Sequence, residues 1–121
     1  MIGVINEQLR IMITLGIRES VEPYLNYEFV LDTGYTYFLT LPGNVIRRLG
    51  LPLIDSMEMI MANGEALRSN IYVGRVFWNG EEKIVPVLEA EGDALLGMEL
   101  LYGNRLTVDI TNEGTATINS L

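Results

Sequence analysis

The feature that most constrains the fold is a strict alternation near the N-terminus. Apolar side chains occupy every second position from Leu9 to Ile17. A period of two places these side chains on one face of an extended strand. A helix would instead need apolar residues three and four positions apart. The pattern therefore predicts a half-buried strand, and we expect a chain built mainly from strands.

Turn signals divide the rest of the chain into further strands. An aromatic and aliphatic run from Tyr24 to Leu31 predicts a second strand. Asn63-Gly64 and Asn79-Gly80 each separate two apolar runs, which is a strong signal for a tight hairpin turn. We therefore expect two consecutive hairpins. Other short strands are expected over residues 37–41, 57–62, 67–78, 82–88, 94–96, 106–110 and 115–118.

Two short helices are expected among the strands. One should open at Pro42, because proline is tolerated in a first helical turn, and Gly50 is suited to end it. The residues on its apolar face would be Val45, Ile46 and Leu49. The second helix is expected over residues 97–102.

The chain is expected to form one domain over residues 1–121, since this length suits a single core and no linker or low-complexity segment interrupts it. Two of its segments share a pattern. Phe29 to Gly34 and Ala94 to Gly97 are both apolar runs that end at or near a glycine, and a predicted short helix follows each. The repetition suggests a domain of two similar halves.

The absence of histidine and cysteine excludes several kinds of catalytic site. Without histidine there can be no Ser-His or Cys-His pair and no histidine-ligated metal. Without cysteine there can be no disulfide, no thiolate nucleophile and no cysteine-ligated zinc. Acid–base chemistry near neutral or acidic pH must then fall to carboxylates. We expect no metal and no cofactor.

Charge and hydropathy argue against nucleic-acid and membrane partners. The formal net charge is -8, and no basic cluster is larger than Arg47-Arg48, whereas nucleic-acid binders usually carry a basic stripe. No apolar run approaches the ~18 residues that span a bilayer. The N-terminal residues lack the basic and apolar regions of a signal peptide. We therefore expect a cytoplasmic protein.

Asp32-Thr33-Gly34 is the motif that carries candidate chemistry. A three-residue match alone is modest, since it would occur by chance in roughly a few per cent of chains this long. The position of the motif strengthens the case for a functional site, because Asp32 directly follows an apolar strand. Burying an unpaired carboxylate is costly, and carboxylates in apolar surroundings often mark functional sites. The alternative reading is an aspartate that caps a turn or helix before Thr-Gly.

In the residues around this motif the sequence resembles the retropepsin-like aspartic peptidases, in particular the small bacterial and archaeal members. The similarity runs from about Glu28 to Ile118. The segments that carry it are Phe29 to Gly34, Leu41-Pro42, Leu49 to Pro52 and Ala94 to Leu101. The resemblance implies a mostly β, closed acid-protease barrel with one or two short helices and two pseudo-symmetric halves.

The resemblance also implies roles for individual residues. Asp32 would be the catalytic carboxylate, Thr33 would hydrogen-bond across a dimer axis, and Gly34 would let the substrate backbone approach. The hairpin from Met61 to Glu65 would be a flap over the substrate, and the terminal strands would help to build the dimer interface. The residues expected to contact substrate are Tyr35, Thr36, Met61, Ala62, Asn63, Gly64 and Leu96.

Because the chain of 121 residues carries a single Asp-Thr-Gly, a catalytic pair of aspartates would require a homodimer. Peptide hydrolysis by carboxylates needs two that share one proton, so two copies of Asp32 must meet on a two-fold axis. Tyr35 and Tyr37 depart from the family, which often has small residues there, and would reshape the pocket. The alternatives are a non-catalytic dimeric binding or assembly domain of the same fold and an unrelated β-barrel scaffold.

Overall fold

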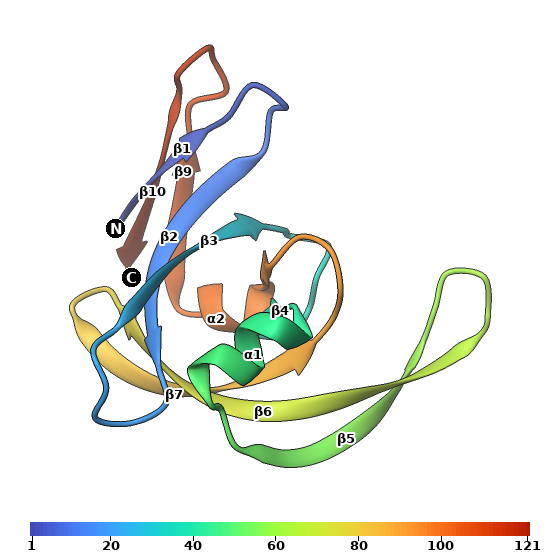
Figure 1. The fold of residues 1–121 in the computed structure, drawn as a ribbon. Coiled ribbons are helices and arrows are strands. Elements are labelled where there is room, and N and C mark those ends of the chain that lie inside the picture. Colours follow the sequence, from blue (N-terminus) through green and yellow to red (C-terminus); the bar gives the residue numbers. More distant parts are fainter.

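The structure, a computed structural model, describes residues 1–121 and consists of ten strands and two short helices (Figure 1). The elements in chain order are β1 (Ile2–Ile5), β2 (Ile11–Arg18), β3 (Leu25–Leu31), β4 (Leu39–Leu41), α1 (Gly43–Leu49), β5 (Leu53–Ile60), β6 (Ala66–Trp78), β7 (Glu81–Glu89), β8 (Leu95–Leu96), α2 (Met98–Leu101), β9 (Asn104–Val108) and β10 (Thr115–Ser120).

Six strands close into a barrel in the order β6-β7-β4-β8-β3-β2. The ring closes because β2 pairs on its other side with β6, at Gly16↔Phe77 and Arg18↔Arg75. The alternating residues of β2 point inward, and Ile13, Leu15 and Ile17 are at most 1% exposed. The prediction of a mostly β, closed barrel with two short helices is confirmed, and the period of two is its physical basis.

The sheet continues beyond the barrel from β2 through β1 and β10 to β9, which is its free edge. β1 and β10 are antiparallel neighbours, and the Met1 amino group donates to the Ile118 carbonyl at 3.2 Å. Figure 1 shows the two termini side by side, with these three strands standing above the barrel. The terminal strands thus pair within one chain, and one edge of β9 stays open.

The loop before β2 differs from the sequence prediction. β2 begins at Ile11, and Leu9 is 72% exposed in the left-handed region with φ of 62°. Asn6 builds the loop, because its side-chain Oδ1 accepts hydrogen bonds from the backbone N–H groups of Gln8 and Arg10, both at 3.0 Å. The prediction that Leu9 belongs to the strand is wrong, since the alternation continues into a turn that reverses the chain.

Both predicted hairpins are present, but their turns differ. Asn79 and Gly80 both have positive φ, 48° and 83°, as a two-residue turn between β6 and β7 requires. In the β5–β6 hairpin only Gly64 has positive φ, and the Met61 N–H donates to the Glu65 carbonyl at 2.8 Å. The second geometry is a longer loop with a left-handed glycine at its end.

Helix α1 follows the sequence prediction closely. Pro42 precedes it, and Gly50 ends it in the left-handed conformation with φ of 69°. Val45 and Ile46 are buried, while Arg47 and Arg48 are exposed in the last turn, where positive charge suits the helix dipole. Neither helix of the structure has the length and apolar character needed to cross a bilayer.

Candidate active site

Asp32 lies at the end of β3, where the strand turns sharply. Its backbone N–H donates to the Leu96 carbonyl at 2.9 Å, and its own carbonyl accepts from the Tyr35 N–H at 3.1 Å. The side-chain Oδ1 accepts from the Gly34 N–H at 2.8 Å. Main-chain and side-chain bonds together fix the carboxylate in a half-buried position.

The two segments that share an apolar pattern lie side by side. β3 and β8 pair in parallel, with Val30 opposite Leu95 and Leu31 opposite Leu96. β8 also pairs with β4, so it sits between the strand that leads to Asp32 and the strand that leads to α1. Leu96 is fully buried beneath Asp32 and supports it through its carbonyl. The prediction that the Leu96 side chain contacts substrate is wrong, because the structure places this side chain in the core.

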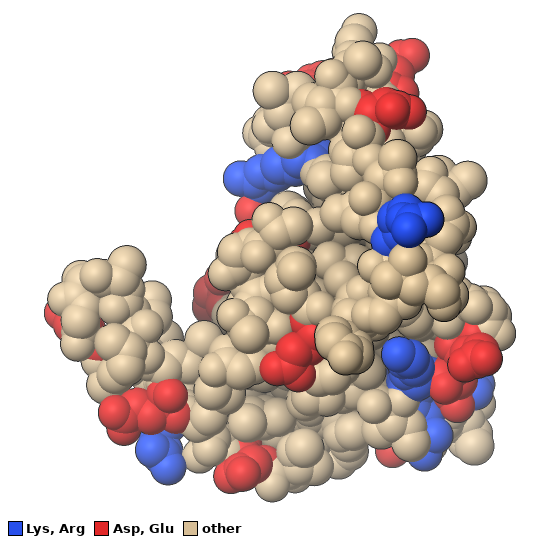
Figure 2. Space-filling view, turned by 180° about the vertical axis from the view of Figure 1, so that it is seen from behind, with Lys and Arg blue, Asp and Glu red and all other residues tan.

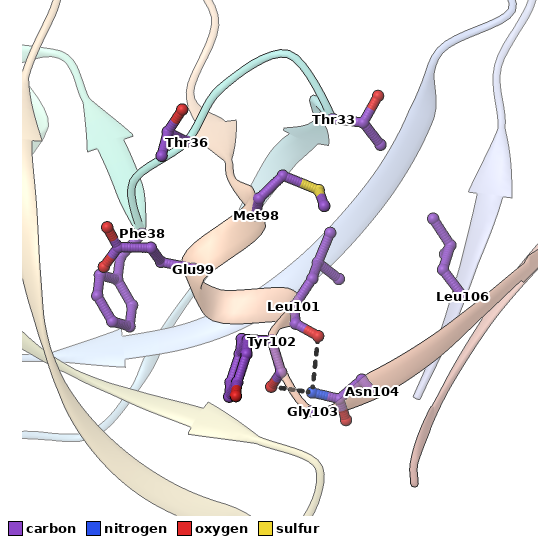
Figure 3. A pocket seen from close by; sticks show the side chains of 10 residues that line it. All are labelled: Thr33, Thr36, Phe38, Met98, Glu99, Leu101, Tyr102, Gly103, Asn104 and Leu106. Carbon is purple, nitrogen blue, oxygen red and sulfur yellow. Dashed lines mark hydrogen bonds between the residues drawn. The ribbon is translucent and has the colours of Figure 1, made fainter.

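Thr33 and Gly34 form the exposed tip of the loop. The position of Gly34 is tight on one side only, since an added Cβ would lie 3.2 Å from Oδ1 of Asp32 and meet nothing else within 4 Å. Thr33 lines a hollow at the side of the loop (Figure 3). Both residues are therefore open to a partner or a substrate.

Tyr35 was predicted to line the substrate pocket, but its side chain is 9% exposed and packs inside the loop. Its ring lies edge-on to Tyr37, with ring centroids 5.8 Å apart. An added Cβ on Gly97 would lie 2.6 Å from Cδ2 of Tyr35, so the glycine makes room for the ring. The Tyr35 hydroxyl is buried without a hydrogen-bond partner, and burial raises the pKa of this phenol above its ordinary value of 10.0.

Helix α2 is fastened to the same loop by its first backbone groups. The Met98 N–H donates to the Tyr35 carbonyl at 2.8 Å, and the Glu99 N–H donates to the Thr36 carbonyl at 2.9 Å. These N–H groups belong to the first turn of a helix and have no partner inside it. The loop that carries Asp32 is thus held from below by β8 and from the side by α2.

An apolar hollow of about 640 Å³ opens beside Thr33, between the active-site loop, α2 and β9 (Figure 3). Its wall is mainly Met98, Leu101 and Leu106, and Tyr102 at its rim is 87% exposed. The Asn104 side-chain amide donates to the carbonyls of Leu101 and Tyr102 at 3.3 and 3.2 Å, which fixes the passage from α2 into β9. Sequence reasoning missed this hollow, because residues far apart in the chain form it.

The predicted flap is an arm formed by the end of the β5–β6 hairpin. Every residue from Ile60 to Arg68 is exposed, including the predicted substrate contacts Met61, Ala62, Asn63 and Gly64. Figure 1 shows the arm reaching away from the barrel, and in Figure 2 a deep notch separates it from the body. The structure therefore does not bring the arm onto Asp32 within one chain.

One chain supplies one of the two carboxylates that the predicted catalytic site needs. Asp32 can accept a proton from water, but proton sharing needs a second carboxylate close by. Thr36 and Thr33 line the hollow beside it, whereas Tyr35 and Leu96 lie in the core. The arm residues remain apart from all of them. The arrangement is thus a supported single carboxylate next to an open apolar surface.

Comparison with known proteins supports the fold. No protein-family model and no curated protein matches the chain. Among solved structures, the chain is similar to a retropepsin-like aspartic protease from Rickettsia conorii, with a TM-score of 0.61 and 18% sequence identity. The match covers 100% of this chain and 90% of the other. At this identity the similarity shows a retropepsin-like fold, and the chemistry has to be argued from the site.

Proposed function

We propose that two copies of this chain form an aspartic endopeptidase in which each copy contributes Asp32. The observation that carries the proposal is the position of Asp32-Thr33-Gly34 at the end of β3, bound through the Asp32 N–H to the Leu96 carbonyl of β8. This position belongs to a barrel similar to a retropepsin-like aspartic protease. The substrate is a peptide or protein.

In the proposed reaction the two carboxylates share one proton, because like charges a few Å apart cannot both be ionised. The ionised Asp32 takes a proton from a water molecule, whose oxygen attacks the peptide carbonyl carbon. The protonated Asp32 gives its proton to the developing oxyanion. When the tetrahedral intermediate collapses and the C–N bond breaks, the Asp32 that took the proton from water passes it to the leaving amine, and the other Asp32 regains a proton from a hydroxyl of the intermediate. The pair titrates as a unit.

The surrounding residues support this chemistry in distinct ways. The Gly34 N–H binds Oδ1 of Asp32 at 2.8 Å and so fixes the orientation of the carboxylate. Thr33, exposed at the loop tip, is available to bond across the dimer axis. Thr36 and the arm residues from Met61 to Gly64 would contact substrate once a second copy completes the cleft. The arm would have to move or meet its partner to cover the substrate.

The test compares the wild type with Asp32→Asn on a diverse peptide mixture between about pH 4 and pH 7. Asparagine is nearly isosteric but cannot complete the proton-sharing pair, so we expect cleavage to fall about 100-fold or more while folding is kept. Asp109→Asn is the matched control, since Asp109 is exposed on the β9–β10 hairpin. Sedimentation would establish the oligomeric state of all three proteins.

The outcomes separate the competing functions. Equal cleavage by the wild type and Asp32→Asn would exclude Asp32 as the catalytic group. A dimer of the wild type that cleaves no peptide would favour the alternative, a non-catalytic binding or assembly domain of this fold. A wild type that never dimerises would count against a dyad altogether and favour a scaffold role.

A further inference from the structure

Leu9 occupies a conformation that leucine rarely adopts. Its φ of 62° lies in the left-handed region, where a Cβ crowds the carbonyl of its own residue and glycine or asparagine is usual. The side chain is nevertheless 72% exposed, so packing within this chain does not explain it. The β1–β2 turn explains the left-handed backbone, since the Leu9 N–H donates to the Asn6 carbonyl and the Asn6 N–H donates to the Arg10 carbonyl, both at 3.0 Å. The turn does not explain why an exposed leucine stands there, and this is a reason to look for a function.

The loop that carries Leu9 lies at the same end of the molecule as Asp32. β2 and β3 are antiparallel, with Met12 opposite Val30, so the turn before β2 and the loop after β3 project from the same end of the strand pair. Arg10, the next residue, forms an ion pair with Asp93, just before the β8 strand that supports Asp32. Leu9 is thus an exposed apolar knob at the end of the β2–β3 pair that carries Asp32.

The apolar hollow between α2 and β9 opens at this end as well, because Thr33 is part of its wall. Met98 at its mouth is 46% exposed, and Leu106 is half-buried. A second Asp32 can approach the first only if the Thr33 ends of two copies face each other. Since Leu9 and the hollow both belong to this end of the molecule, a two-fold arrangement of this kind would let the knob of one copy meet the hollow of the other.

We propose that Leu9 of each copy packs into the α2–β9 hollow of the other and so anchors the dimer that completes the active site. The inference rests on the proposed function, because the second carboxylate is what requires the Thr33 ends to meet. The occupant is a second copy of this chain. The contact occurs twice by symmetry, and it covers an exposed leucine and an exposed methionine at the same time.

The first test replaces Leu9 by asparagine. Asparagine tolerates the left-handed conformation, so the monomer should unfold at the same temperature as the wild type or higher. Two buried leucines are lost from each dimer, and we expect the dissociation constant to rise about 100-fold. Leu9→Met keeps an apolar side chain and should retain the dimer. Val21→Asn is the control, since Val21 is 87% exposed in the turn at the opposite end of β2 and β3.

The second test mixes two weakened variants. Met98→Lys places a charge at the mouth of the hollow, so this variant should also dimerise poorly. A mixed dimer of Leu9→Asn and Met98→Lys chains keeps one intact contact, the leucine of the lysine variant in the hollow of the asparagine variant. Analytical ultracentrifugation of the mixture should therefore detect a dimer at concentrations where neither variant alone forms one, and peptide cleavage should return with it.

The outcomes distinguish this inference from the proposed function. If Leu9→Asn dimerises as tightly as the wild type while the wild type cleaves peptides, the knob is refuted and the function stands. If both variants are weak but do not restore each other, the reciprocal contact is refuted. A wild-type dimer that Leu9→Asn weakens, but that cleaves nothing, supports the interface and counts against the function. A wild type that stays monomeric refutes both.

Discussion

Replacing Tyr35 by phenylalanine should stabilise the folded monomer. The Tyr35 hydroxyl is buried and has no hydrogen-bond partner, and an unsatisfied buried polar group costs about 1–3 kcal/mol relative to water. Phenylalanine keeps the ring that packs against Gly97 and Tyr37, so the packing is retained. We expect the free energy of unfolding to rise by about 1–2 kcal/mol, which corresponds to roughly 3–8 °C in midpoint for a domain of this size.

The assay is urea and thermal unfolding at a concentration low enough to keep the chain monomeric. Tyr37→Phe is the matched control, because Tyr37 is only half-buried and its hydroxyl is not an unpartnered buried atom; its effect should stay within about 0.5 kcal/mol. A loss of stability of about 1 kcal/mol or more in Tyr35→Phe would mean that the hydroxyl makes a bond in the folded monomer, and the reasoning would be refuted.

Two further variants test the packing and the electrostatics. Gly97→Ala should destabilise the chain by about 3 kcal/mol in urea unfolding, because the new methyl would overlap the Tyr37 carbonyl and the Tyr35 ring; an unchanged midpoint would mean that α2 can move aside. Glu82 accepts hydrogen bonds from Tyr24 and Arg18 at 2.6 and 2.8 Å, and these bonds lower its pKa from the ordinary 4.5. A carboxylate whose pKa is lower in the folded than in the unfolded chain stabilises the folded state at pH values above its unfolded-state pKa. This stabilisation is lost as the pH falls through the folded-state pKa. Glu82→Gln should therefore lose less stability than the wild type between about pH 5 and pH 3, and parallel pH curves for the two proteins would contradict this.

The barrel could be predicted from local pattern. The alternation that includes Ile13 and Ile17 fixes which face of β2 is inside, and Asn79-Gly80 fixes a hairpin through its two left-handed residues. Pro42 and Gly50 mark the ends of α1 for equally local reasons. Each of these signals acts over a few residues and needs no knowledge of the rest of the chain.

The surroundings of Asp32 could be predicted only in part. Leu9 continues the apolar alternation in the sequence, and leucine is not a residue type from which a left-handed turn conformation would be predicted. The burial of Tyr35 depends on space left by Gly97, 62 positions later in the chain. The hollow depends on how β9 returns beside the loop at Thr33. The burial of Tyr35 and the hollow follow from tertiary packing, which periodicity and turn signals do not encode, whereas the Leu9 turn is fixed by the local hydrogen bonds of Asn6.

The energetically unfavourable features of the folded monomer are concentrated in one part of the molecule, and this bears on function. The unpartnered Tyr35 hydroxyl and the open apolar hollow lie at the Asp32 loop, and Leu9 in the left-handed region lies at the same end of the β2–β3 pair. None of them helps to close the barrel, and a single substitution such as Leu9→Asn or Tyr35→Phe would relieve a cost without disturbing the core. A chain shaped only by the stability of its monomer has no reason to keep them together at one end. The proposed pair of copies meeting at Thr33 would give a reason for the knob and the hollow, because both would become buried surface when the second carboxylate arrives.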